Sequence, residues 1–237
     1  MTMVPEAKRS GTRPSWRQRF VRSVYADQND SPAVRAALQP LLDGLGTGRG
    51  VNIGGGPRRL EARLVHVDLV RHPACDCVAD AGALPFARGT FDLAVSQEVV
   101  EHVEDPFQAV REMVRVVRPG GALYLQVPFV IGYHPGPEDY WRFSRAGVAA
   151  LLRQAGIDAA EVQIAVGPGT GTYRIAVEFL AGVAGRLLPA LYQPMKALAA
   201  LVCYPVKWFD GWLAGGRERD RIAGGYLAVA TKPDDRR

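Results

Sequence analysis

Cysteine is scarce in this sequence, and its scarcity limits the class of protein. The 237 residues include three cysteines, Cys75, Cys77 and Cys203, which cannot form a fully paired disulfide framework. No apolar signal-peptide segment follows the start, so we expect a reducing, cytoplasmic compartment. Cys75 and Cys77 form a C-x-C pair, whereas a structural zinc site takes four ligands at C-x-x-C-like spacing. We therefore expect these cysteines in the core or at strand edges, and no metal.

The apolar segment before the last expected strand also lacks a long uncharged run. Residues 173–221 are rich in apolar side chains, but the longest uncharged run among them has ten residues, between Lys196 and Lys207. A membrane-spanning helix needs about 18 or more. Prolines interrupt the stretch at three positions. We expect a helical insertion that covers a ligand site or forms an interface, with a homodimer contact and a peripheral membrane contact both open.

Acidic residues are nearly absent from the first two dozen positions, where Lys8 and five arginines face only Glu6. This segment carries the equivalent of the whole formal charge of +5. Such an arm could meet anionic lipid, nucleic acid or a phosphorylated ligand, but a solvated terminus is commoner. We expect residues 1–30 to form a basic, flexible arm and residues 31–237 one domain. Because no asparagine-proline-proline-aromatic string for a flipped base is present, we expect no nucleic-acid partner.

Strand and helix signals alternate from residue 31 onward. Ser31 and Asp105 each precede a proline at a first helical position, and Ser144 starts a third helix. Apolar residues repeat at helical spacing after each of these caps. The short apolar runs predict strands at residues 50–53, 64–68, 77–80, 91–96, 122–127, 161–166 and 226–231. This alternation predicts βαβ units in a mainly parallel, doubly wound α/β sheet.

Features suited to a nucleoside ligand stand at the ends of the first three expected strands. Gly54, Gly55 and Gly56 follow the first, where a glycine-rich turn lets the backbone approach a ligand and a following helix offers free N–H groups. Asp68 ends the second, where a carboxylate can accept hydrogen bonds from ribose hydroxyls. Asp80 ends the third and adds an acceptor near the expected adenine. The short crossover before Asp68 leaves room for a helix of only a turn or two.

A longer series of motifs resembles a known family. In order, the series reads VNIGGG at 51–56, VD at 67–68, ADAGALPF at 79–86, FDLAVS at 91–96 with EHV at 101–103, and RVVRPGG at 115–121. Over about residues 48–130 it is similar to the type 11 methyltransferases, a class I family that uses S-adenosylmethionine. An NAD-binding fingerprint would carry glycine where Arg59 stands, which counts against hydride transfer.

The resemblance implies a fold and a set of cofactor contacts. It implies a seven-stranded Rossmann-like sheet of order 3-2-1-4-5-7-6 whose last strand is antiparallel. It assigns the methionine part of the cofactor to Gly54 and Gly56, the ribose to Asp68, the adenine to Asp80 and Ala81, and the region near the fourth strand to Gln97. Two residues depart from the family pattern. Asn52 replaces an acidic residue of the first motif, and Arg58 replaces its last glycine.

A polar and aromatic cluster follows the fifth expected strand, where this architecture opens its ligand crevice. The segment 133–143 holds His134, a candidate general base because histidine titrates near neutrality. Asp139, Tyr140 and Arg142 are candidate substrate-binding residues. An alternative interpretation is that Asp139 pairs with Arg142 and that the aromatic residues pack the loop. We interpret His102, after the fourth strand, as structural or cofactor-adjacent.

These observations support three hypotheses on function. The first is a small-molecule methyltransferase of secondary metabolism that acts on an oxygen of a sugar, polyketide or similar acceptor. The second is a quinone or lipid methyltransferase at the membrane surface, because Trp208, Phe209 and Trp212 lie in the apolar insertion with Lys196 and Lys207. The third is a non-catalytic cofactor-binding subunit, based on the two departures from the first motif.

Overall fold

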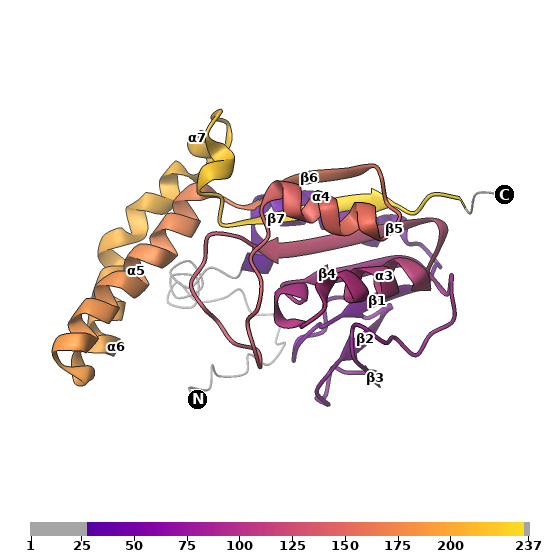
Figure 1. The fold of residues 1–237 in the computed structure, drawn as a ribbon, viewed down its shortest axis with the longest axis horizontal. Coiled ribbons are helices and arrows are strands. Elements are labelled where there is room, and N and C mark those ends of the chain that lie inside the picture. The colour runs from indigo at the N-terminus through magenta and orange to yellow at the C-terminus, as the bar shows by residue number, and fades with distance from the viewer. Residues whose placement is uncertain (1–27, 235–237) are drawn as a thin grey trace.

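A computed structural model describes residues 28–234 of the chain (Figure 1). Most of the expected basic arm therefore lies outside the described residues. A short 3-10 helix, η1 (Gln28–Asp30), leads into helix α2 (Pro32–Gly44). The Ser31 hydroxyl accepts a hydrogen bond from the Val34 N–H at 3.1 Å and donates one to the Ala165 carbonyl at 2.6 Å. Ser31 thus both caps α2 and ties it to the far edge of the sheet.

Seven strands form one sheet in the order β3-β2-β1-β4-β5-β7-β6. β7 pairs antiparallel with both of its neighbours, and all other pairs are parallel. The sheet order and the antiparallel last strand are confirmed. The strands are β1 (Gly50–Ile53), β2 (Leu64–Asp68), β3 (Cys77–Val78), β4 (Phe91–Gln97), β5 (Val117–Pro128), β6 (Ala160–Val166) and β7 (Gly225–Thr231).

Two strands differ in length by two or more residues from the sequence prediction. β3 ends at Val78, so Asp80 lies in the loop beyond it. β5 begins at Val117, five residues before the expected start at 122, because the preceding helix runs directly into it. Gly120 has a φ of 71°, and the register with β4 shifts between Phe91 and Leu93. The proline-glycine-glycine segment at 119–121 is therefore an irregular start to the strand.

Helices cover both faces of the sheet because alternate strand residues point to opposite sides. Ala94 of β4 packs in one cluster with Val110 and Met113, whereas Leu93 and Val95 pack in another with α2. The first cluster lies under the 3-10 helix η2 (Val100–His102), α3 (Pro106–Val116) and α4 (Arg145–Gln154). The expected cap residues hold, since the side chains of Asp105 and Ser144 accept hydrogen bonds from the first turns of α3 and α4.

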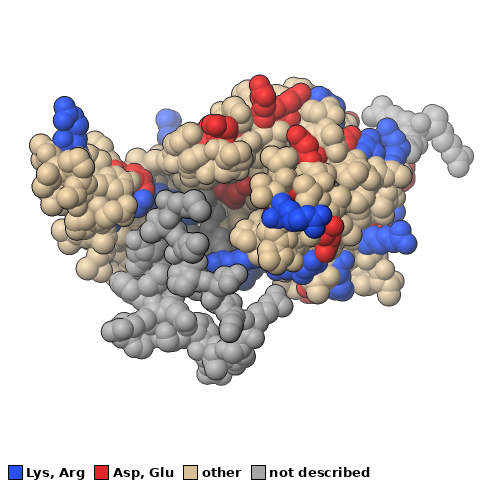
Figure 2. Space-filling model, turned by 90° about the horizontal axis from the view of Figure 1, so that it is seen from below, with Lys and Arg blue, Asp and Glu red and all other residues tan. Residues whose placement is uncertain are grey.

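A helical insertion separates β6 from β7, as expected, but it begins at Pro168 and not near residue 173. Its segments are α5 (Pro168–Leu187), η3 (Pro189–Leu191), α6 (Tyr192–Cys203), η4 (Tyr204–Phe209), α7 (Asp210–Ala214) and η5 (Arg219–Arg221). α5 and α6 project from one end of the sheet (Figure 1) and form the mostly uncharged lobe at the left of Figure 2. Across residues 28–234, no helix has the length and apolarity that a membrane crossing requires.

The crossover from β1 to β2 corrects one expectation. Residues 54–63 form turns and bends, and no helix follows the glycine turn. The ten residues between the two strands are too few for a helix and its return, since a parallel crossover with a helix takes a dozen or more. Arg59 anchors this loop by an ion pair with Asp76 at 2.6 Å and a hydrogen bond to the Leu64 carbonyl at 3.3 Å.

Candidate functional site

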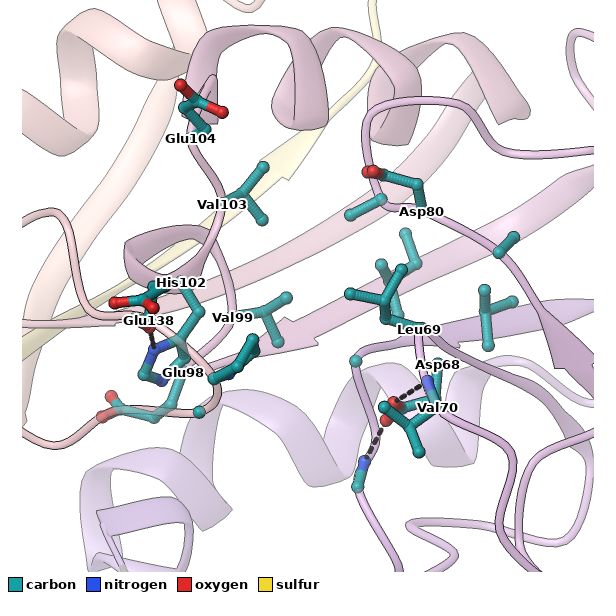
Figure 3. Close-up of a pocket in the computed structure, with 18 of the residues that line it drawn as sticks. Asp68, Leu69, Val70, Asp80, Glu98, Val99, His102, Val103, Glu104 and Glu138 are labelled. Carbon is teal, nitrogen blue, oxygen red and sulfur yellow. Dashed lines mark hydrogen bonds between the residues drawn. The ribbon is translucent and has the colours of Figure 1, made fainter.

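A pocket of 490 Å³ opens at the carboxyl ends of the central strands (Figure 3). Parallel strands end on the same edge of a sheet, so residues distant in sequence meet there. Five of the seven residues predicted to bind the cofactor line this pocket, namely Gly54, Gly56, Asp68, Asp80 and Ala81. Tyr140, a predicted substrate contact, lines it from the loop after β5. The other two predicted cofactor residues, Gly55 and Gln97, do not line it.

The glycine turn shows why Gly54 and Gly55 take no larger residue. Gly54 has a φ of 68°, and a Cβ there would lie 2.4 Å from a methyl carbon of Val99. A Cβ on Gly55 would lie 2.4 Å from the Asn52 side-chain nitrogen. Asn52 is buried and its amide nitrogen lies 3.3 Å from Nδ1 of buried His66. Asn52, which departs from the family pattern, does not line the pocket. We therefore interpret it as a residue that packs beneath the turn.

Backbone donors orient the two predicted aspartates. One Asp68 oxygen accepts from the Gly56 N–H at 2.9 Å and the other from the Val70 N–H at 3.0 Å (Figure 3). One Asp80 oxygen accepts from the Gly82 N–H at 2.7 Å. Charge-assisted bonds of this kind fix a carboxylate while leaving other lone pairs for a ligand. The pocket thus presents two oriented acceptors on neighbouring strand ends.

Two glutamates near the pocket were not singled out from the sequence. Glu98 follows β4 with a φ of 55°, and burial together with the Glu101 carboxylate raises its pKa to about 8. Glu101 lies in η2, its side chain is fully buried, and neither of its carboxylate oxygens has a hydrogen-bond partner among the described residues. In the sequence, the two glutamates could have been recognised by the i, i+3 spacing of their carboxylates just after a central strand.

The loop after β5 packs onto η2 through backbone hydrogen bonds. The N–H groups of Tyr140 and Trp141 donate to the Glu101 carbonyl at 2.8 Å and 3.3 Å. Asp139 pairs with Arg142 at 2.5 Å and accepts from the His134 N–H at 2.8 Å. The Arg142 guanidinium lowers the pKa of Asp139 to about 2. The Asp139 side chain is 1% exposed.

The two histidines of this region meet edge to face, with ring centroids 5.1 Å apart. His102 lines the 490 Å³ pocket, whereas His134 lines a second cavity of 240 Å³ against α5 and α6. The Glu101 carboxylate raises the pKa of His134. Asp139 and Arg142 line neither cavity, so the pairing expected in the alternative interpretation is present, and their contact with a substrate stays a prediction.

Comparisons with known proteins relate part of this chain to a family of methyltransferase domains. Residues 44–125 match the family of type 11 methyltransferase domains. An uncharacterized methyltransferase of Mycobacterium sp. (strain JLS) is 45% identical over 60 residues, which are 25% of this chain and 24% of that protein. Norajmaline N-methyltransferase of Rauvolfia serpentina is 46% identical over 48 residues, 20% of this chain and 16% of that protein. The chain thus spans less than a third of the length of these relatives.

Two solved structures share the fold. Phosphoethanolamine N-methyltransferase 2 of Haemonchus contortus, bound to phosphomonomethylethanolamine and S-adenosylhomocysteine, has a TM-score of 0.53 at 17% identity, over 90% of this chain and 56% of that one. The 1,6-didemethyltoxoflavin-N1-methyltransferase of Burkholderia thailandensis has a TM-score of 0.51 at 18% identity, over 92% and 87%.

The sheet order is that of the class I S-adenosylmethionine-dependent methyltransferase fold, and the pocket lies at its strand ends. Within that fold, residues 44–125 match the model of the type 11 methyltransferase domain.

Proposed function

We propose that the protein transfers a methyl group from S-adenosylmethionine to an oxygen of a small-molecule acceptor, such as a sugar or secondary metabolite. The observation that carries the proposal is the single pocket that gathers Gly54, Asp68 and Asp80 from three strand ends. The named neighbours act on diverse acceptors, and both solved ones are N-methyltransferases, so the acceptor atom belongs to the proposal.

The residues of the pocket fit the parts of S-adenosylmethionine. The Gly54–Gly56 backbone leaves space for the methionine part, since a Cβ on Gly56 would meet nothing within 4 Å. Asp68 would accept hydrogen bonds from the ribose hydroxyls, and Asp80 with Ala81 would contact the adenine. Leu69 and Val70, both exposed, offer apolar surface beside Asp68.

The cofactor supplies an electrophilic methyl group on a sulfonium, which an acceptor displaces in line. The protein then needs chiefly to hold and align the acceptor, which contributes up to about 7–11 kcal/mol in well-oriented systems. A hydroxyl acceptor also has to lose a proton. We assign to His134 the role of general base or acceptor-orienting group, with Asp139, Tyr140 and Arg142 shaping its surroundings.

Calorimetry with S-adenosylmethionine and S-adenosylhomocysteine tests the cofactor part of the proposal. We expect both ligands to bind the full chain, and no binding of either at millimolar concentration would contradict it. A panel of matched hydroxyl and amine acceptors, assayed by methyl transfer, tests the oxygen part. Turnover on amines alone would contradict that part and leave the cofactor part standing.

One observation favours a second candidate, a lipid or quinone methyltransferase at the membrane surface. The insertion exposes large apolar side chains on several of its helices, and Trp208 and Trp212 are 75% and 76% exposed. Exposed apolar groups on a projecting lobe suit an interfacial contact. A lipid-like acceptor would then reach the 240 Å³ cavity, which α5 and α6 border, from the membrane.

A further inference from the structure

Two histidines and a glutamate converge behind the cofactor pocket. Glu101 and His102 come from η2, and His134 comes from the loop after β5. The Glu101 Oε1 atom lies 3.6 Å from His102 Nε2 and 3.7 Å from His134 Nε2. One ligand atom of each residue can be chosen so that all three lie within 4.8 Å of one another. The proposed function uses only His134 of these three, so the cluster as a unit has no role in it.

The hydrogen-bond partner of Nδ1 shows which nitrogen of each neutral histidine ring carries the hydrogen. His102 Nδ1 lies 2.6 Å from the Glu138 carbonyl oxygen, and His134 Nδ1 lies 3.1 Å from the Gly132 carbonyl oxygen. A carbonyl oxygen only accepts, so each Nδ1 carries the hydrogen. Arg142 Nη2 lies 3.3 Å from His134 Nδ1, but its two hydrogens are taken by the Gly132 carbonyl and Asp139. In the neutral rings, both Nε2 atoms therefore present lone pairs.

The centre of the cluster then holds acceptors without a donor. Both Glu101 oxygens and His134 Nε2 are buried without a hydrogen-bond partner among residues 28–234. Separations of 3.6 and 3.7 Å are too long for hydrogen bonds even if the rings were protonated. A buried carboxylate that accepts no hydrogen bond is destabilising, and a protonated histidine would offset its charge only across 3.6 or 3.7 Å. A cation placed between the three atoms would satisfy all of them at once.

We propose that Glu101, His102 and His134 bind one divalent transition-metal ion of the zinc type. Two imidazoles and a carboxylate are a ligand set of catalytic zinc sites, which keep a fourth position open. Ligand atoms about 2.0–2.2 Å from zinc in a tetrahedral site lie about 3.3–3.6 Å apart. The two separations between Glu101 and the histidines, 3.6 and 3.7 Å, are close to this range. The carbonyls on both Nδ1 atoms supply the outer hydrogen bonds that orient metal-binding histidines.

The ion would lie between the two cavities, since His102 lines the larger and His134 the smaller. An open coordination position there could hold an oxygen of the acceptor. Metal binding itself does not depend on methyl transfer. It does decide the role of His134, because a nitrogen that ligates a metal cannot also accept a proton. With the ion bound, His134 orients the acceptor through the metal and is not the general base.

The test measures metal binding on the full chain, stripped with a chelator and dialysed against Zn²⁺. We expect about one ion per chain by elemental analysis, and visible absorption of Co²⁺ typical of nitrogen and oxygen ligands. Loss of an outer-shell partner costs about 10–100-fold in metal affinity, so removal of a ligand in His134→Ala or Glu101→Gln should cost at least about 100-fold. Cys75→Ser with Cys77→Ser, and separately His72→Ala, are the matched controls and should bind as the parent does.

Three results would overturn the proposal. They are no Zn²⁺ bound by the parent at millimolar concentration, binding lost in the cysteine or His72 controls, and binding retained in the ligand variants. Circular dichroism melting checks that each variant folds, and His102→Ala replaces a ligand variant that does not. S-adenosylhomocysteine binding to the metal-free chain is measured on the same samples, so failure of the cofactor proposal is seen separately from failure of the metal proposal.

Discussion

Asp68 is the residue whose contacts predict the clearest effect on cofactor binding. Two backbone N–H groups orient its carboxylate, and its side chain is 18% exposed toward the pocket. If it accepts charged hydrogen bonds from the ribose, Asp68→Ala should weaken S-adenosylmethionine binding by roughly 1.5–3 kcal/mol. Calorimetry measures this change. Asp43→Ala on α2, where the carboxylate accepts a hydrogen bond from Gln39, is the control and should bind normally. Equal affinity of parent and Asp68→Ala would remove the ribose role.

His134 carries the acceptor side of the proposal. If it removes a proton or orients the acceptor, His134→Ala should lower turnover by about 10²–10⁴-fold with little change in cofactor affinity. Steady-state kinetics with the true acceptor measures the first quantity and calorimetry the second. His134 does not line the cofactor pocket, which is why cofactor affinity should be retained. Unchanged turnover would assign the loop to packing and leave catalysis to alignment alone.

At the scale of elements, the β1–β2 crossover contains no helix, and an ion pair anchors it. Arg59 holds Asp76, which also accepts from the His66 N–H at 2.9 Å, so the loop is tied to β2 and to the segment before β3. The Arg59 guanidinium lowers the pKa of Asp76 to about 2. A carboxyl whose folded pKa is depressed stabilises the fold above its unfolded pKa and loses this contribution as the pH falls through the folded value.

The lowered pKa of Asp76 predicts that the difference in melting temperature between the parent and Asp76→Asn depends on pH. Above about pH 5 the parent should melt at the higher temperature, and the gap should close as the pH falls toward about 2. The expected effect is small, because Asp76 is 42% exposed and solvent screens the pair. Thermal melting by circular dichroism across this range measures it. A gap that stays constant with pH would show that Asp76 acts through packing.

At the scale of the whole molecule, the insertion is distinct from the sheet domain. Its small cluster of Tyr173, Val177, Ala199 and Ala200 leaves the outer faces of α5 and α6 exposed. Trp208 of η4 and Trp212 of α7 are exposed as well. If these apolar surfaces of the insertion lie on a membrane, full-length protein should sediment with vesicles that contain anionic lipid. Burial of a large apolar side chain contributes about 1.5–3 kcal/mol, so Trp208→Ser with Trp212→Ser should lower the vesicle affinity at least about tenfold.

Neutral vesicles and raised salt are the controls for this measurement, because they weaken electrostatic attraction and leave apolar contact. If the parent does not sediment with any vesicle, the small-molecule candidate stands and the lobe serves another interface, such as a homodimer contact. Carbonate washing of the membrane fraction tests the related expectation that the insertion does not cross the bilayer. Recovery only in the integral-membrane fraction would contradict a lobe that lies outside the bilayer.

The sequence by itself determined the strands of this protein and the edge of the sheet that holds the pocket, and its resemblance to the type 11 methyltransferases implied the sheet order. Periodicity located all seven strands, and the motifs around Gly54, Asp68 and Asp80 each follow a strand. Because parallel strands end on one edge, residues at successive strand ends have to meet whatever the details of packing. Local signals also located the caps at Ser31, Asp105 and Ser144, since capping depends on neighbours within a turn.

Only the tertiary structure decided which side chains meet behind the pocket at that edge of the sheet. Glu101 and His134 are 33 positions apart, and no local pattern shows that a loop folds back to place their side chains 3.7 Å apart. Burial sets the pKa of Glu98, and burial is a property of the packed chain. The edge-to-face contact of His102 with His134 and the packing of Tyr140 onto η2 likewise depend on which partners the fold brings within reach. Long-range contacts of this kind are specified by the summed packing of the whole domain, so a strand-by-strand interpretation cannot supply them.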